Sequence, residues 1–172
     1  SILYDGDDDF NSSYGGVIVS VSPDEYLNYV YINNCMFADN AALYGGAIAC
    51  NSTCLEIKGS QFYNSRAVCG GGSIYAINSD LTVSASYFSN NSASHGGSIY
   101  CVNSDLGIYY SDIDYSTSYS FGGAVAIRSS DLYINSVNFR RCISLNGAGG
   151  AVYTEKSNAN ITSCEFKQGQ AF

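Results

Sequence analysis

Several residue types are scarce in this chain of 172 residues, and each scarcity excludes something. The chain has no tryptophan, one proline and one histidine, and seven basic residues stand against fifteen acidic ones, for a formal net charge of −8. Because so few lysines and arginines leave no basic stripe, we expect no nucleic-acid partner and no attraction to an anionic membrane surface. No run of 18 apolar residues occurs, so we expect no transmembrane helix and no membrane insertion.

The counts of proline, cysteine and histidine favour a β-strand fold and argue against a zinc site. Proline cannot donate a hydrogen bond to a β-ladder, so its near absence suits uninterrupted strands. The seven cysteines include no Cys-x-x-Cys pair and the single histidine is His95, so the sequence predicts no zinc site. We expect no cofactor.

What the chain does contain is a repeat. A Gly-Gly pair followed one residue later by Ile or Val occurs six times, at intervals of 30, 26, 25, 26 and 27 residues. The pairs begin at Gly15, Gly45, Gly71, Gly96, Gly122 and Gly149. Aligned on these pairs, the copies share apolar columns, one of which reads Phe37, Phe62, Phe88, Ile113, Phe139 and Phe166. Short β-branched runs bounded by Gly, Asn, Ser and Asp predict strands.

A unit of this length cannot bury its own apolar side, so the copies are expected to stack. Stacked strands lie roughly 4.8 Å apart through backbone hydrogen bonds, and each column then becomes an inward ladder of like side chains. The sequence therefore predicts an all-β fold, a right-handed parallel β-helix of about six coils over residues 15–172, with repeats of about 25–27 residues.

Glycine, asparagine and aspartate predict the corners of each coil. Glycine reaches backbone conformations that a Cβ forbids, so the Gly-Gly pairs predict one sharp corner. Asn and Asp tolerate similar corners through local side-chain hydrogen bonds. The triplets at 78–80, 103–105 and 129–131 therefore predict a second stacked corner.

Two motifs carry a resemblance to a known family. Gly-Gly-Ala-Ile at 45–48, with Phe-x-x-Asn at 37–40 and 88–91, resembles the repeats of the polymorphic outer-membrane protein family. The resemblance covers roughly residues 10 to 172, although Phe-x-x-Asn has lost its Asn after Phe139 and Phe166. It implies a surface-exposed, adhesin-like β-helix and specifies no ligand.

Residues 1–14 are expected to form an irregular acidic segment before the repeats. Asp5, Asp7 and Asp9 make up its sharpest charge cluster, and clustered carboxylates suit Ca²⁺. A solvated acidic cap, which discourages stacking as charges on an edge strand do, explains the same residues and is the interpretation we favour.

Cysteines and sequons supply candidate covalent modifications. A disulfide needs Cα atoms roughly 4.4–6.8 Å apart, about one coil step. Cys50 and Cys54 flank a turn and are the one pair predicted to bridge locally, whereas most other cysteines are expected in the core. Cys35 and Cys164 share a column at opposite ends, so they meet only across a junction between copies. Sequons, which mark glycosylation only in a secreted chain, occur at Asn11, Asn51, Asn90 and Asn160.

One carboxylate pair raises the question of catalysis. Asp112 and Asp114 alternate along a predicted strand, so both face outward, and paired carboxylates perform glycoside hydrolysis. No third Asp, Lys, Arg or His recurs beside them in neighbouring columns, Arg128 and Arg140 being the nearest candidates. We therefore expect no enzyme.

Tyrosines suggest a second surface feature. Tyr75, Tyr100 and Tyr153 share a column that faces outward and predict a surface aromatic ladder. Exposed tyrosines can stack on sugar rings or pack against protein. Their β-propensity alone explains the same residues, so both interpretations stay open.

The last residues of the sequence suggest what kind of partner the protein has. The sequence ends one residue after the ladder alanine Ala171, just where the next Gly-Gly pair is expected, and an uncovered coil edge templates strand addition. We expect a non-enzymatic extracellular or cell-surface β-helix, structural or adhesin-like, whose partners are copies of itself, head to tail, or adjacent β-helix repeats. The alternative is a carbohydrate-binding or polysaccharide-cleaving β-helix, with glycans or a host or cell-surface protein as partners.

Overall fold

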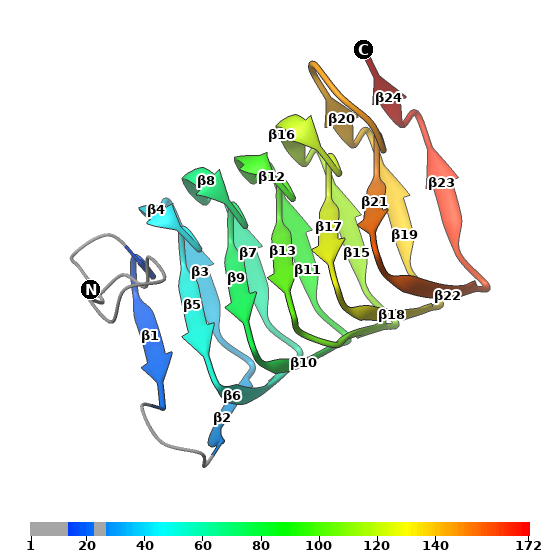
Figure 1. Ribbon diagram of the computed structural model, residues 1–172. Coiled ribbons are helices and arrows are strands. Elements are labelled where there is room, and N and C mark those ends of the chain that lie inside the picture. Colours follow the sequence, from blue (N-terminus) through cyan, green and yellow to red (C-terminus); the bar gives the residue numbers. More distant parts are fainter. Residues whose placement is uncertain (1–13, 23–26) are drawn as a thin grey trace.

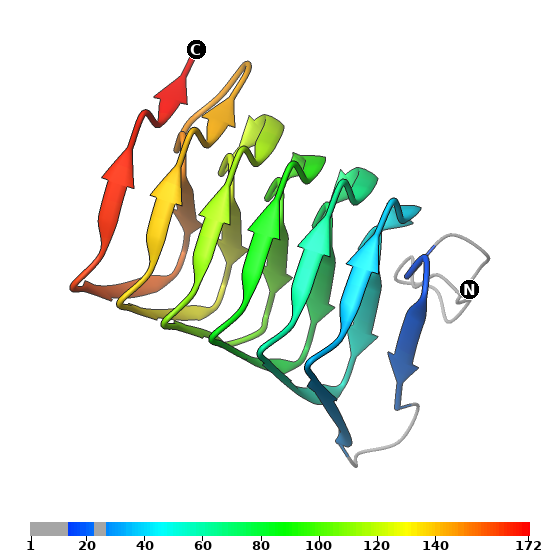
Figure 2. The same cartoon turned by 180° about the vertical axis from the view of Figure 1, so that it is seen from behind.

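The computed structural model, which describes residues 14–22 and 27–172, is a stack of coils arranged in one line from β1 to β24 (Figures 1 and 2). Each coil contributes one short strand to each of four parallel sheets, and every sheet contains six strands. The described part of the chain has strands and turns but no helix. The predicted all-β solenoid of about six coils is confirmed.

Each coil begins at a Gly-Gly pair and passes through the four sheets in turn. The first sheet contains β1 (Ile18–Val21), β5 (Ile48–Asn51), β9 (Ile74–Ile77), β13 (Ile99–Val102), β17 (Val125–Arg128) and β21 (Val152–Glu155). The second sheet contains β2 (Asn28–Asn33), β6 (Thr53–Lys58), β10 (Asp80–Ser84), β14 (Leu106–Tyr109), β18 (Asp131–Asn135) and β22 (Asn158–Thr162).

The third and fourth sheets complete each coil. The third sheet contains β3 (Met36–Ala38), β7 (Gln61–Tyr63), β11 (Tyr87–Ser89), β15 (Asp112–Asp114), β19 (Asn138–Arg140) and β23 (Glu165–Lys167). The fourth sheet contains β4 (Ala41–Tyr44), β8 (Arg66–Gly70), β12 (Ser92–His95), β16 (Thr117–Phe121), β20 (Ile143–Ser144) and β24 (Gln170–Ala171).

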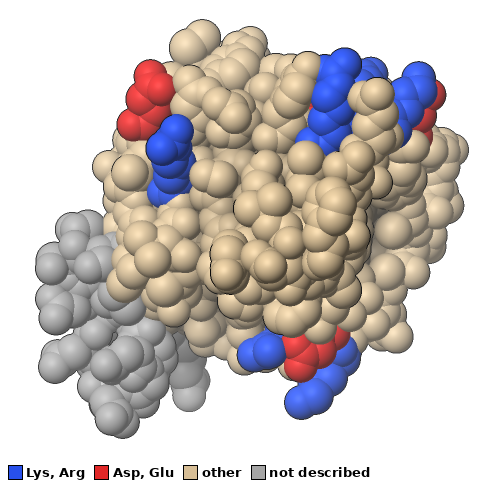
Figure 3. All heavy atoms as spheres, turned by 90° about the horizontal axis from the view of Figure 1, so that it is seen from above, with Lys and Arg blue, Asp and Glu red and all other residues tan. Residues whose placement is uncertain are grey.

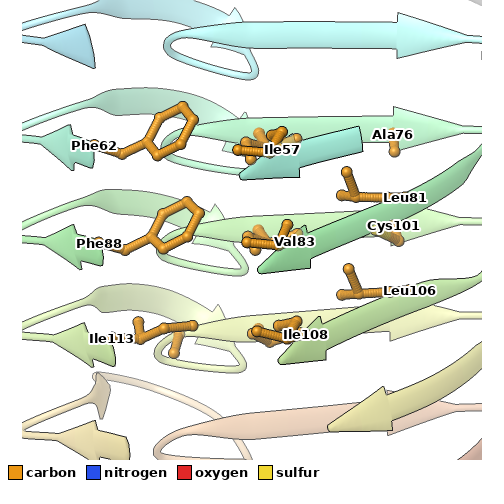
Figure 4. Close-up of a cluster of buried hydrophobic side chains, with 14 of the residues drawn as sticks. Ile57, Phe62, Ala76, Leu81, Val83, Phe88, Cys101, Leu106, Ile108 and Ile113 are labelled. Carbon is orange, nitrogen blue, oxygen red and sulfur yellow. The ribbon is translucent and has the colours of Figure 1, made fainter. Parts of the chain in front are cut away.

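The register places like residues above like, as the aligned repeats predict. Leu81 of β10 pairs with Leu55 of β6 and with Leu106 of β14. In the next sheet the rings of Phe62 and Phe88 stack with centroids 4.6 Å apart and an angle of 4° between their planes. Figure 4 shows these columns in successive coils. The core is therefore one continuous set of ladders rather than a separate core in each coil.

Residues with positive φ mark the corners between sheets. At the Gly-Gly corner, Gly71 has φ 63°, and a Cβ there would clash with the carbonyl oxygen of Ile74. The corner predicted from the Asn-Ser-Asp triplets is confirmed, with φ 49° at Asn78 and Asn103 and 53° at Ser129. The backbone therefore needs glycine at one corner and accepts mainly small polar residues at another.

Buried serines at the corners connect one coil to the next. Ser86 Oγ accepts a hydrogen bond from the N–H of Ser60, one coil away, at 3.1 Å and donates to the carbonyl of Ser84 at 2.8 Å. At another corner the N–H of Ser79 donates to Ser104 Oγ at 2.9 Å in the same way. These hydroxyls supply the partners that corner amides lack where the β-ladder is interrupted.

Replacement of one corner serine tests this arrangement. Ser86→Ala leaves the buried N–H of Ser60 without its acceptor, so we expect the free energy of unfolding to fall by about 1–3 kcal/mol. Urea denaturation measures the change. Thr82→Ala, on the exposed face of β10, is the control and should change stability by no more than about 0.5 kcal/mol. Equal losses in the two variants would show that the serine hydroxyls contribute nothing specific.

Candidate functional site

The carboxylate pair on β15 lies in an ion-pair cluster, in which Asp112 is half-buried and Asp114 is only 9% exposed, because side chains of the neighbouring coils cover it. Arg140 Nη1, on the neighbouring β19, lies 3.3 Å from Asp112 Oδ1 and 3.6 Å from Asp114 Oδ1. Tyr87 donates a hydrogen bond to Asp114 Oδ2 at 3.2 Å, and Asn138 donates to Asp112 Oδ1 at 2.8 Å. One oxygen of each carboxylate therefore accepts a hydrogen bond, whereas the buried Asp114 Oδ1 has Arg140 at 3.6 Å and no hydrogen-bond donor. Arg140, one of the two arginines named as candidates, contacts both carboxylates.

Metal-binding residues do not gather in the described part of the chain. No group of three or more His, Cys, Asp or Glu side chains there could hold one ion. The calcium candidates Asp5, Asp7 and Asp9, and the sequon at Asn11, lie outside the described residues.

All seven cysteines are free thiols, so the predicted Cys50–Cys54 disulfide is not formed. Cys50 is buried in the core, whereas Cys54 alternates with the buried Thr53 and Leu55 and faces outward. Burial raises the pKa of the Cys50 thiol to about 12.

The remaining cysteines fall into two groups. Fewer lie in the core than predicted, since the buried ones are Cys50, Cys101 and Cys142. Cys35 is exposed and Cys164 half-buried. They flank the same corner in the first and last coils, beside β3 and β23 of the third sheet. Their pairing across a junction stays a prediction.

The described sequons differ in access. Asn51 is 6% exposed and its Oδ1 accepts a hydrogen bond from Asn78 at 3.3 Å, so the folded chain leaves no room for a sugar there. Asn90 and Asn160 are exposed. Glycosylation at these two residues stays a prediction.

The tyrosine column predicted as a surface ladder is partly covered. Tyr75 is 6% exposed and packs in a small apolar cluster with Tyr14 and Ala49. The ring of Tyr44, which precedes a Gly-Gly pair, lies 4.8 Å from the ring of Tyr75. The ladder prediction is therefore wrong for Tyr75, because side chains from a second column fold over the same strip of surface.

Two columns together build one row of rings along the stack, which we call the aromatic row. One column is the residue before each Gly-Gly pair, and the other is the third residue after it. The row runs through Tyr14, Tyr44, Tyr75, Tyr100, His95, Phe121 and Tyr153, with neighbouring ring centroids 4.6–5.7 Å apart. Where the residue before a Gly-Gly pair is large, the residue after that pair can be small. Tyr44 is followed by Ala49 in the second column, and Phe121 is followed by Ala126.

Burial raises the pKa of three phenols in this row, those of Tyr44, Tyr75 and Tyr100. It is the main cause that raises the pKa of Tyr44 to about 12, and the neighbouring Cys69 thiol adds to the effect. Burial raises the pKa of Tyr75 as well. The aromatic row is therefore a partly buried strip of rings outside the main core.

Gly70 makes room for this row, and a pair of substitutions tests the contact. A Cβ at Gly70 would clash with Cδ1 of the Tyr100 ring. We expect Gly70→Ala to lower the free energy of unfolding by about 1–3 kcal/mol through overpacking. In a Tyr100→Ala background the same change should cost much less, because the ring is absent. Thermal unfolding of the four variants of this double-mutant cycle measures the coupling, and strictly additive losses would contradict the contact.

A slot in the fourth sheet is the feature that the sequence predictions missed. Ser92 and His95, at the two ends of β12, pair with the two ends of β8 and with the two ends of β16. Because β12 spans four residues there and each neighbour spans five, β8 and β16 each contain one extra residue. These β-bulges project Val68 and Tyr119, which are 70% and 61% exposed, while Ser94 of β12 lies half-buried between them. The signal was present in the repeat intervals, which are 26, 25 and 26 residues across these three coils.

The slot has two adjoining hollows. The first has a volume of about 410 Å³ and is lined by residues that include Val68, Ser92, Ser94, Thr117, Tyr119 and Leu145. The second, of about 310 Å³, shares Val68 and Ser94 with it and reaches the aromatic row at Tyr44, His95 and Tyr100. Both hollows therefore combine apolar or aromatic side chains with polar ones, and the charged side chain of the pair, Arg128, lines the second.

Polar groups at the second hollow are internally paired. His95 Nδ1 lies 3.2 Å from the carbonyl oxygen of Cys69, which can only accept, so Nδ1 carries the proton. Arg128, which lines the same hollow, donates two hydrogen bonds to Glu155 Oε2, at 3.0 Å and 2.8 Å. The hollow therefore presents polar edges, and its arginine is ion-paired.

The sixth coil, residues 149–172, exposes residues of the core ladders. Ile161 and Phe166 are 39% and 49% exposed, whereas Ile134 and Phe139, one coil earlier in the same columns, are each 1% exposed. In the first coil the same columns are buried, with Phe37 only 7% exposed. The exposed residues of these two columns therefore lie on β22 and β23, whose positions in the stack Figure 1 shows.

Comparison with known proteins agrees with this geometry. Residues 10–171 match the family model described as a right handed beta helix region, so the chain belongs to this family of right-handed β-helix proteins. The match confirms the predicted hand of the solenoid. The narrower resemblance to polymorphic outer-membrane protein repeats rests on the motifs alone. No curated protein and no solved structure matches the chain. In the described residues, no helix is long and apolar enough to cross a membrane.

Proposed function

We propose that this chain is a non-enzymatic structural β-helix of the cell exterior whose sixth coil is covered by a further β-helix coil, which comes from a second copy in end-to-end association or from adjacent repeats of a longer β-helix. The exposed ladder residues Ile161 and Phe166 carry this proposal. A coil with open strand edges and apolar columns fits another coil of the same kind, because each pair of successive coils inside the molecule uses that contact.

Column identity supports a second copy as the partner. The first coil carries Ile32 and Phe37 in the columns of Ile161 and Phe166, so the two ends have columns of like side chains. Ile32 and Phe37 are 5% and 7% exposed, so a direct junction requires the first coil to uncover them. Head-to-tail contacts of this kind do not close and produce linear assemblies. Because Phe37 is already buried, the sixth coil is the accessible half of the junction and the better target for a test.

The state of the carboxylate pair supports a role without catalysis. A general acid and a nucleophile must both be accessible to substrate, whereas Asp114 is only 9% exposed beneath Tyr87 and Arg140. The abundance of Ser, Asn and Tyr, with few lysines, supports an extracellular location.

Charged substitutions in the sixth coil test the proposal. Light scattering over a concentration series should show mass that rises with concentration for the unmodified chain. The double variant Ile161→Lys, Phe166→Lys should remain monomeric, because a junction would bury two unpaired charges. Tyr133→Lys, on the outward face of β18, is the matched control and should assemble like the unmodified chain. A monomer at every concentration, or unchanged growth in the double variant, would contradict the proposal.

A further inference from the structure

We infer that two end-to-end assemblies of this chain pair side by side, in antiparallel orientation, through the outer face of the fourth sheet. The inference rests on the proposed end-to-end association, because the face of one chain alone is too small for a stable contact. A stripe of exposed apolar side chains, a hollow within this stripe and the charge of the sheet support it.

One outward column of the fourth sheet exposes apolar side chains along the whole stack. The column is the residue that follows the inward ladder Ala42, Ala67, Ala93, Ser118, Ser144 and Ala171. We call it the lateral stripe, and its members are Leu43, Val68, Ser94, Tyr119, Leu145 and Phe172. The four large exposed ones, Val68, Tyr119, Leu145 and Phe172, are 45–72% exposed. A contiguous exposed apolar surface of this kind marks a site of interaction.

The lateral stripe is complementary to itself in antiparallel orientation. A two-fold axis between the third and fourth coils would place Tyr119 of one chain over Ser94 of the other, and the reverse. The hollow above Ser94, whose volume is about 410 Å³, has room for that ring. The same axis places Val68 opposite Leu145. In parallel orientation Tyr119 would meet Tyr119 and the two hollows would face each other empty, so the shape favours antiparallel pairing.

The charge of the fourth sheet permits contact between two acidic chains. The formal net charge of the chain is −8, yet the described strands of this sheet contain no Asp or Glu. The formal charge that they carry is that of Arg66, which is exposed at the start of β8 and can keep its guanidinium in water. Figure 3 views the side on which this sheet lies, and its charged side chains sit toward the margins. Two copies therefore repel each other less through this face than through the other three sheets, each of which contains Asp or Glu.

The area of the face indicates that assemblies pair and single chains do not. Six strands roughly 4.8 Å apart make a face about 29 Å long, and the longer strands, of four or five residues, make it roughly 15 Å wide. A pair of single chains would therefore bury roughly 800 Å² in total, which is the size of a crystal contact. Two or more chains joined end to end would bury about 1,600 Å² or more, which is the size of a stable interface.

Electron microscopy of the assembled protein tests the inference. Negative-stain images give the width of each rod, and dark-field images give its mass per unit length. The unmodified chain should form rods with two chains, rather than one, for every six coils of length.

A charge and its complement test the antiparallel orientation. Val68→Glu would place a carboxylate against Leu145 of the neighbouring chain, so the paired fraction of rods should fall about tenfold or more. Val68→Glu combined with Leu145→Lys should restore pairing, because the new charges would face each other across the contact. Tyr133→Lys, on the outward face of β18, is the control and should leave pairing unchanged. Both replaced side chains are exposed, and thermal unfolding verifies that each variant is folded.

The possible failures of the two proposals differ. Single rods in the unmodified protein, paired rods in Val68→Glu, or no recovery in the combined variant would each overturn antiparallel pairing and leave end-to-end association intact. The absence of rods of any kind would overturn both.

Discussion

Backbone hydrogen bonding between successive coils is the constraint on which the rest of this structure depends. It holds neighbouring strands roughly 4.8 Å apart, so a side chain meets the equivalent side chain one coil away. Like residues then gain most by lying in one column, as the stacked rings of Phe62 and Phe88 do. Corners interrupt the ladder, and hydroxyls such as that of Ser86 restore the missing acceptor. Repetition in the sequence is therefore the consequence of repetition in the backbone.

The coils that depart from the regular repeat supply the surface features that are candidates for function. An extra residue in one coil cannot enter the ladder, so it forms a bulge and redirects its side chain. The slot floored by Ser94 arises because two such coils flank one without the extra residue. The sixth coil departs in another way, by exposing Ile161 and Phe166. A lateral slot and an exposed coil are both compatible with an unbroken core.

Features that depend on a single column of the aligned repeats could be predicted from the sequence. The prediction was wrong for Tyr75, where side chains of two columns pack together. The inward Phe and Leu columns and the Gly-Gly corner needed only alignment. Tyr75 was assigned to the surface because alternation alone cannot show that the ring of Tyr44 covers it. The contact of Arg140 with Asp114 follows from register, since the two residues are paired in adjacent strands, and column alignment would have revealed it. Strand alternation would likewise have placed Cys54 on the face away from the core.

Amide hydrogen exchange along the coils tests the central claim that inter-coil hydrogen bonds hold the molecule together. The account predicts that amides of the middle coils, including the corner N–H of Ser60, exchange slowest, and that those of residues 149–172 exchange fastest. Exchange at Ser60 as rapid as in that exposed terminal coil would contradict the role given to the corner serines. Uniform exchange from the middle coils to the sixth would contradict the open end.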